Sequence, residues 1–206
     1  MRIAIDLQGI QSEGSSKRGI GRYSFDIISN IIELYPQYDF ILVVNASLID
    51  LRAKFKNLLL LDNVIYYEWF APCPLNFISN NETTKEVAIY LRSFSLSCIH
   101  ADIFLITSFF EGFTDNCLVE YDKNILKSKV VSIFYDLIPL LNPDQYLDSN
   151  PEFSSFYKAK LLALTKLDGL IAISDSSAKE ATRYLEFDSK YVFNISSACN
   201  TSFFNI

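Results

Sequence analysis

Two glycines and three basic residues near the N-terminus could together hold a phosphate group. Lys17 and Arg18 end a polar stretch that leads into Gly19, Gly21 and Arg22 at the predicted start of a helix. Glycines let a ligand approach the main chain, and the free N–H groups at a helix start favour an anion. The sequence thus predicts a phosphate-binding turn. The same glycines could serve only the turn, and the same cations could form a solvated surface.

The spacing of these glycines argues against a dinucleotide-binding fingerprint. The preceding strand is predicted to end near Asp6, more than ten residues before Gly19, and Ser24 stands where a third glycine would be needed. That fingerprint requires glycines in the tight first turn after the strand. We therefore do not expect nicotinamide chemistry.

An aromatic-rich segment after another predicted strand carries Ser108, Glu111 and Gly112. The acidic side chain could bind sugar hydroxyls, and the neighbouring phenylalanines would offer flat apolar surface. The alternative is a solvated carboxylate above aromatic side chains that belong to the core. Both interpretations remain open from the sequence.

Tyr135, Asp136 and Ser174 also follow apolar segments and are candidate site residues. A phenol with a pKa of about 10 is a poor proton shuttle, so Tyr135 is predicted to position a sugar or an acceptor. Asp136 is a candidate catalytic carboxylate, or the first residue of a turn ahead of Pro139. Ser174 could contact a ligand phosphate, or it could cap a helix.

The elements that must position these residues alternate between short apolar runs and longer amphipathic stretches, which is typical of βαβ units. The apolar runs are continuous, as expected of strands covered on both faces. We predict one α/β, Rossmann-like domain over residues 1–206, with a mostly parallel sheet of about seven strands and helices on both faces. The predicted strands are 2–6, 40–44, 64–68, 103–107, 130–134, 169–173 and 191–195.

The predicted helices follow from apolar spacing and from helix-ending residues. Apolar side chains repeat at helical spacing over 20–35, and Pro36 ends the pattern. Further helices are predicted over 85–99 and 151–167, and the segment 69–84 is predicted to be a loop.

A last helix is predicted to follow Ser177, because Ser177 and Glu180 match a capping box. Since the candidate segments begin where predicted parallel strands end, we expect them at one edge of the sheet. The residues expected there are Gly19, Gly21, Ser108, Glu111, Tyr135 and Ser174.

Composition excludes several classes of function. A formal net charge of -6 and a pI near 4.8 argue against nucleic acid as a partner. The four cysteines are scattered and His100 is the single histidine, so neither a zinc site nor a disulfide framework is expected. The N-terminus lacks the pattern of a signal peptide, and no apolar stretch approaches about 18 residues. We expect a cytoplasmic protein.

Taken together, the candidate segments resemble bacterial family 4 glycosyltransferases, especially polysaccharide mannosyltransferases. The resemblance runs through almost the whole chain in the expected order. Its segments are 5–9, 18–24, 107–113, 135–139, 171–177 and 199–204. Many relatives have a histidine immediately before the aspartate of the fourth segment, where this chain has Tyr135.

The resemblance implies the N-terminal half of a GT-B fold, which chiefly holds the acceptor, while a C-terminal half grips the sugar nucleotide. It implies transfer of a hexose, best assigned as mannose from GDP-mannose, with retention of configuration, to a surface polysaccharide or lipid-linked oligosaccharide. The sugar nucleotide is a co-substrate, and no metal or other cofactor is expected. A C-terminal GT-B domain is expected as a partner in cis or in trans, and a lipid-linked acceptor would bring peripheral contact with the inner face of the cell membrane.

Three other interpretations stay open. The chain could be a binding or assembly module without catalysis, one subunit of a split glycosyltransferase whose donor domain is a separate polypeptide, or an unrelated nucleotide-binding domain. The isolated chain is expected to be inactive as a glycosyltransferase, since the implied donor-binding half is absent from residues 1–206.

Overall fold

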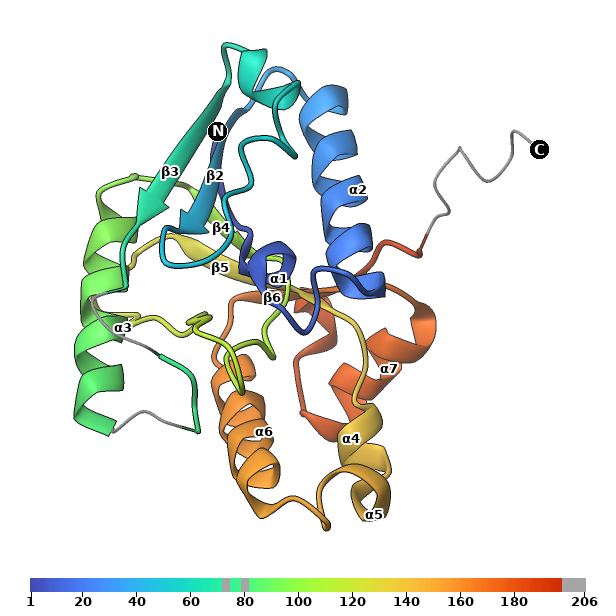
Figure 1. The fold of residues 1–206 in the computed structure, drawn as a ribbon. Helices are drawn as coiled ribbons and strands as arrows, with labels where there is room; N and C mark the ends of the chain where they lie inside the picture. Colours follow the sequence, from blue (N-terminus) through green and yellow to red (C-terminus); the bar gives the residue numbers. More distant parts are fainter. Residues whose placement is uncertain (72–74, 79–81, 198–206) are drawn as a thin grey trace. The chain divides into compact units, whose positions relative to one another are not determined.

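The computed structural model describes residues 1–71, 75–78 and 82–197, and it contains one seven-stranded sheet (Figure 1). The strands are β1 (Arg2–Asp6), β2 (Asp39–Asn45), β3 (Val64–Trp69), β4 (Ile103–Ile106), β5 (Lys129–Phe134), β6 (Gly169–Ala172) and β7 (Val192–Asn194). Their order is β3-β2-β1-β4-β5-β6-β7. The pairs β1–β2, β1–β4, β2–β3 and β6–β7 are parallel. The predicted Rossmann-like α/β fold is confirmed, and each strand end lies within one residue of its prediction.

The chain consists of two compact units, unit 1 (Met1–Val131) and unit 2 (Ser132–Ile206). In unit 1, the central strand β1 carries Ile5, which is paired in register with Leu42 of β2 and Leu105 of β4. All three side chains are buried. Continuous apolar blocks form these strands because both faces are covered.

The long helices of unit 1 are α2 (Gly19–Leu34) and α3 (Glu82–Ser97), which lie on opposite sides of its strands (Figure 1). On α2, Ile28 and Ile32 are fully buried, so the predicted apolar stripe faces the core. The helix ends one residue before Tyr35, as predicted from Pro36. Helix α3 begins three residues earlier than predicted. The predicted loop 69–84 lies partly outside the described residues.

Unit 1 also contains the short helix α1 (Gln8–Gln11), which sequence patterns did not predict, and a 3-10 turn at Leu58–Leu60. A Cβ on Gly9 would lie 2.7 Å from the Cβ of Ser108. Glycine thus lets α1 pack directly on the segment that follows β4.

The helices of unit 2 are α4 (Ile138–Leu141), α5 (Pro143–Tyr146), α6 (Pro151–Leu164), α7 (Asp175–Tyr184) and a 3-10 turn at Ser189–Tyr191. Two short helices, α4 and α5, were not predicted. On α6, the side chain of Asn150 accepts a hydrogen bond from the N–H of Phe153 at 3.0 Å, which caps the helix directly before its first-turn proline.

The predicted start of the last helix is wrong. Helix α7 begins at Asp175, and its N-cap is Ser174, whose Oγ accepts from the N–H of Ser177 at 3.1 Å. Ser177 is not the cap because its hydroxyl is buried and donates to the carbonyl oxygen of Tyr135. Two serines three residues apart offer alternative caps, and the extended backbone of Ser174 selects the first.

Within the described residues, no helix is both long enough and apolar enough to cross a membrane.

Candidate functional site

The turn between α1 and α2 contains two glycines with different surroundings. A Cβ on Gly21 would lie 2.6 Å from the carbonyl oxygens of Ser15 and Ser16. The N–H of Gly21 donates to the carbonyl of Ser15 at 3.1 Å, so it is already engaged within the protein. A Cβ on Gly19 would meet nothing within 4 Å. Gly21 is therefore required for packing, whereas Gly19 leaves open space beside the start of α2.

Three exposed cations surround this turn. Lys17, Arg18 and Arg22 are all exposed, and none of them forms an ion pair with another described residue. Arg18 occupies the N-cap position of α2 and has no side-chain cap bond. The predicted arrangement of open main chain, helix start and unpaired positive charge is thus present in unit 1.

Glu111 lies in the segment after β4 and is almost fully buried, with 6% of its surface exposed. Its Oε1 accepts hydrogen bonds from the hydroxyls of Ser15 at 2.6 Å and Ser108 at 2.7 Å. Burial raises the pKa of the Glu111 carboxyl above its ordinary value, while the hydroxyls of Ser12, Ser15 and Ser108 oppose that shift. The sequence alternative of a solvated carboxylate does not hold, because Glu111 is enclosed by serines.

Gly112 fixes the main chain beside Glu111. Its φ is +98°, and a Cβ there would lie 2.3 Å from the carbonyl oxygen of Cys117. This conformation strongly favours glycine. The following turn is held by Asp115, whose Oδ1 accepts from the N–H of Cys117 at 3.1 Å. Burial raises the pKa of the Cys117 thiol well above its ordinary value, so this cysteine is not an activated nucleophile.

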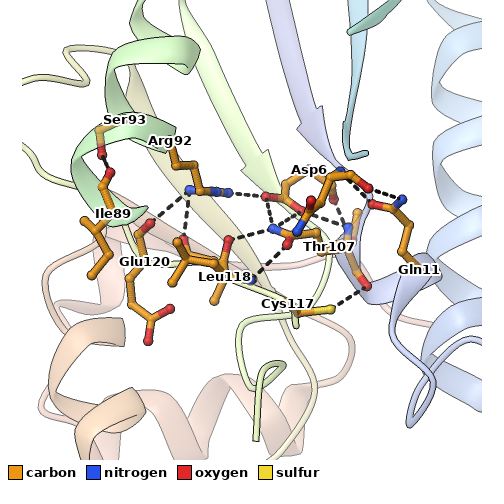
Figure 2. Close-up of polar contacts among 12 residues, drawn as sticks. Asp6, Gln11, Ile89, Arg92, Ser93, Thr107, Cys117, Leu118 and Glu120 are labelled. Carbon is orange, nitrogen blue, oxygen red and sulfur yellow. Dashed lines mark hydrogen bonds and ion pairs between the residues drawn. The ribbon is translucent and has the colours of Figure 1, made fainter. Parts of the chain in front are cut away.

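A buried ion pair lies behind these segments. Arg92 of α3 and Asp6 at the end of β1 form a salt bridge in which both side chains are buried (Figure 2). The Nη1 of Arg92 also donates to the carbonyls of Val119 at 3.2 Å and Glu120 at 3.1 Å. The guanidinium thus ties β1 to the segment that follows Cys117. Sequence patterns did not single out Arg92, although its four-residue spacing from the buried Ala88 and Leu96 places it on the inner face of α3.

Gln8 extends this network. Its Nε2 donates to Oδ2 of Asp6 at 3.0 Å and to the carbonyl of Leu118 at 2.6 Å, and its Oε1 accepts from the N–H of Leu118 at 2.9 Å. Thr107 donates from Oγ1 to the carbonyl of Asp6 at 2.8 Å (Figure 2). The segments after β1 and β4 are therefore joined by buried polar side chains, and every one of these contacts lies within unit 1.

The candidate residues of unit 2 gather where β5 and β6 end. The carbonyl of Tyr135 accepts from Ser177, and the N–H of Leu137 donates to Oε2 of Glu180 at 2.9 Å. The Oδ1 of Asp136 accepts from the N–H of Ile138 at 3.0 Å. The turn interpretation of Asp136 is thus observed, while its catalytic role stays a prediction. Glu180 was proposed only as a capping residue, and its contact with this loop was missed.

Tyr157 of α6 is a further residue that sequence patterns did not single out. It is buried, and burial followed by the negative charge of Asp136 raises the pKa of its hydroxyl. The helical apolar spacing of α6 makes a core tyrosine the ordinary expectation, so the sequence carried no signal for this raised pKa.

The structure therefore brings the predicted residues together in two groups. Unit 1 holds Gly19, Gly21, Arg22, Ser108, Glu111 and Gly112, and unit 2 holds Tyr135, Asp136 and Ser174. The segment 199–204 lies outside the described residues. Among the described residues, no group of three or more histidine, cysteine, aspartate or glutamate side chains is arranged to hold a metal ion.

Comparison with known proteins gives the following relationships. No protein-family model matches the chain. The serotype-specific mannosyltransferase WbdA of Escherichia coli is 35% identical over 208 residues, which cover 98% of this chain and 24% of WbdA. A second Escherichia coli WbdA is 34% identical over 154 residues, covering 75% of this chain and 19% of that protein. The chain thus spans about a quarter of the length of these relatives, or less.

Among solved structures, UGT89C1 of Arabidopsis thaliana complexed with UDP aligns with a TM-score of 0.52 and 10% identity. The alignment covers 98% of this chain and 50% of that one. At such low identity the likeness concerns the fold alone. The chain is therefore a homologue, along nearly its whole length, of a segment of a serotype-specific mannosyltransferase, and it has the fold of half a GT-B glycosyltransferase.

Proposed function

We propose that this chain is the acceptor-side half of a retaining family 4 glycosyltransferase that transfers a hexose from a sugar nucleotide to a bacterial surface polysaccharide or lipid-linked oligosaccharide. Mannose from GDP-mannose is the specific form of this proposal. The observation that carries it is the 35% identity to a serotype-specific mannosyltransferase over 98% of the chain. The fold, shared with half of a GT-B enzyme, supports the same assignment.

The start of α2 is the proposed contact with the diphosphate of the sugar nucleotide. Gly19 leaves space for close approach, and Arg18 and Arg22 place positive charge beside the open helix end. These groups favour an anion without a metal ion. Gly21 contributes indirectly, because its missing side chain lets the preceding serine segment pack against α2.

The loop after β5 is the proposed contact with the transferred sugar or the acceptor. Tyr135 is half-buried, and its main chain is held by Ser177. A phenol can donate and accept hydrogen bonds, so Tyr135 is assigned to positioning rather than to proton transfer. Asp136 is the proposed catalytic carboxylate, with one oxygen already stabilising the turn to Ile138.

Catalysis also requires a donor-binding C-terminal domain, in cis or in trans. A leaving nucleoside diphosphate develops negative charge in the transition state, and enzymes stabilise such charge with prearranged donors and cations. Without that domain, water competes with the exposed cations of unit 1 for the phosphate groups. We therefore expect weak sugar-nucleotide binding and negligible transfer by the isolated chain.

Calorimetric titration of the 206-residue chain with GDP-mannose and UDP-sugars tests this proposal, together with a transfer assay with and without a supplied C-terminal domain. We expect mannose transfer only with that domain. Arg22→Ala should weaken donor binding roughly tenfold by removing one charge-assisted contact. Lys56→Ala, at another exposed basic residue of unit 1, is the matched control and should have no effect.

Submicromolar donor affinity or repeated turnover by the isolated chain would overturn the half-enzyme assignment. Failure to transfer any hexose in the presence of the C-terminal domain would contradict the glycosyltransferase assignment itself. Equal effects of Arg22→Ala and Lys56→Ala would remove the phosphate contact from the proposal.

A further inference from the structure

The accepting oxygen of Glu111 is occupied by the protein itself. Both Ser15 and Ser108 donate to Oε1, at 2.6 and 2.7 Å, and only 6% of the residue is exposed. A carboxylate oxygen that already accepts two hydroxyls, with little access from solvent, is poorly placed to receive sugar hydroxyls as well. Glu111 is thus directed toward the serine segment 12–18.

Ser15 transmits this contact to the start of α2. Its side chain is held by Glu111, while its carbonyl oxygen accepts from the N–H groups of Arg18 at 3.0 Å and Gly21 at 3.1 Å. A Cβ on Gly21 would lie 2.6 Å from that same carbonyl oxygen. The position of Ser15 therefore determines where the helix and its basic side chains begin.

A second carboxylate holds the same segment. The hydroxyl of Ser12 donates to Oδ2 of Asp115, and the carbonyl of Ser12 accepts from the N–H groups of Ser15 at 3.3 Å and Ser16 at 2.8 Å. Asp115 and Glu111 both belong to the segment after β4. The serine segment is thus fixed at two points to a part of the chain about a hundred residues away in sequence.

The main chain that carries Glu111 is itself constrained. Gly112 has a φ of +98°, and its carbonyl accepts from the N–H of Phe77 at 3.0 Å. Because the backbone next to Glu111 has little freedom, the carboxylate is a hydrogen-bond acceptor in a fixed position for Ser15. A flexible acid would not define the place of its partner.

We propose that Glu111 is a positioning residue which, by holding Ser15 against the end of β4, sets the place of Arg18, Gly19 and Arg22 for an anionic phosphate ligand. The consequence for the ligand rests on the proposed function. The positioning itself is a property of unit 1 and can be measured without any substrate.

Hydrogen exchange at the amides of Arg18 and Gly21 in the 206-residue chain is the direct test. In Glu111→Ala and in Ser15→Ala, these two amides should exchange at least about fivefold faster, the change expected for loss of one net hydrogen bond. Glu111→Gln keeps an oxygen that can accept from both serines, so it should restore slow exchange. Glu180→Gln, in unit 2, is the matched control and should leave both amides unchanged.

The transfer assay with the C-terminal domain supplies the second readout. Glu111→Ala should raise the KM for the sugar nucleotide roughly tenfold with a smaller change in kcat, and Glu111→Gln should restore most of the loss. If Glu111 instead bound the sugar directly, the amides of Arg18 and Gly21 would still exchange slowly in Glu111→Ala, while the affinity for the sugar nucleotide would fall. That result would overturn the positioning role.

Far-UV circular dichroism establishes whether each variant is folded. If Glu111→Ala does not fold, the comparison of Ser15→Ala with Ser108→Ala decides, since only the first removes the link to α2. Equal exchange at Arg18 and Gly21 in these two variants would overturn the proposal. An absence of glycosyl transfer would contradict the proposed function and leave the exchange result to stand by itself.

Discussion

The loops at the strand ends of unit 1 and those of unit 2 are held in different ways. In unit 1, buried side chains bind one another over long sequence separations, as in the pairs Glu111 with Ser15 and Asp6 with Arg92. In unit 2, side chains of α7 bind the main chain of the neighbouring loop, as Ser177 and Glu180 do. The first arrangement depends on paired side chains inside the core, and the second on single, partly buried contacts between a side chain and the main chain.

This contrast indicates which substitutions report on folding and which report on function. Loss of one member of a buried pair leaves its partner unsatisfied, which costs more than the contact itself contributed. Loss of a contact to an accessible main-chain group lets water take its place. We therefore expect changes in the buried pairs of unit 1 to appear first as lost stability, and changes at these contacts of unit 2 to appear with little loss of stability.

The largest effect is expected for the buried ion pair. Arg92→Met replaces the guanidinium by an unbranched, apolar side chain and leaves the Asp6 carboxylate buried without its cation. We expect a loss of about 3–5 kcal/mol in the free energy of unfolding. Urea denaturation measures this loss. Arg183→Met, at an exposed position of α7, is the control and should change stability by about 0.5 kcal/mol or less.

Equal effects of these two substitutions would contradict the expected difference between the units. A small loss in both would mean that the hydrogen bonds Asp6 already receives, such as that from Nε2 of Gln8 at 3.0 Å, are enough to hold its carboxylate when Arg92 is absent.

The next effect concerns the two glycines at the start of α2. Gly21→Ala would force a Cβ to within 2.6 Å of two carbonyl oxygens, and we expect a loss of about 2 kcal/mol in stability. Gly19→Ala meets open space and should change stability by about 0.5 kcal/mol or less. Thermal or urea unfolding of the pair gives the answer.

The same pair separates folding from ligand binding. If Gly19 is the point of close approach for a phosphate, Gly19→Ala should weaken sugar-nucleotide binding in the reconstituted enzyme while stability stays unchanged. An unchanged affinity would instead assign Gly19 to the turn alone.

Much of the fold followed from the sequence, because continuous apolar blocks and helical spacing are local signals. All seven strand positions agree within one residue, and Pro36 correctly marked the end of α2. The start of α7 was misplaced because Ser174 and Ser177 both fit a cap pattern, and the choice depended on a tertiary contact of Ser177 with Tyr135. Local patterns contain no information about that contact.

The candidate site was predicted less completely. The residue types at strand ends were identified, and the structure joins Ser108 to Glu111 as their spacing allowed. The pairing of Glu111 with Ser15 spans 96 residues, so no local pattern could indicate it. Arg92 could have been found, since an arginine on the apolar face of a helix needs a buried acidic partner.

A smaller effect is expected at the N-terminus of α7 in unit 2. Ser174→Ala removes the hydroxyl that accepts from the N–H of Ser177, and we expect a loss of about 1 kcal/mol in stability. Ser176→Ala, at an exposed neighbouring serine, should be nearly neutral. If sugar-nucleotide binding also falls in Ser174→Ala but not in Ser176→Ala, the predicted ligand contact of Ser174 gains support beyond its capping role.

The smallest effect at any single pH is the contribution of Glu111 ionisation. It appears as a change in the free energy of unfolding with pH. Burial raises the pKa of this carboxyl above its ordinary value of 4.5, so the folded protein binds a proton more tightly than the unfolded chain does. The stability contribution of Glu111 is then fully present below 4.5 and is lost as the pH rises through the folded pKa. Urea unfolding of wild type and Glu111→Gln from about pH 4 to about pH 8 should show wild type losing stability relative to the variant. Ser108→Ala should steepen that loss, because the Ser108 hydroxyl opposes the rise in pKa. Parallel curves for wild type and Glu111→Gln would mean that the serines offset burial and leave the pKa of Glu111 unshifted. A wild type that gains relative stability with pH would mean that the serines outweigh burial and that the buried network of unit 1 favours the charged acid.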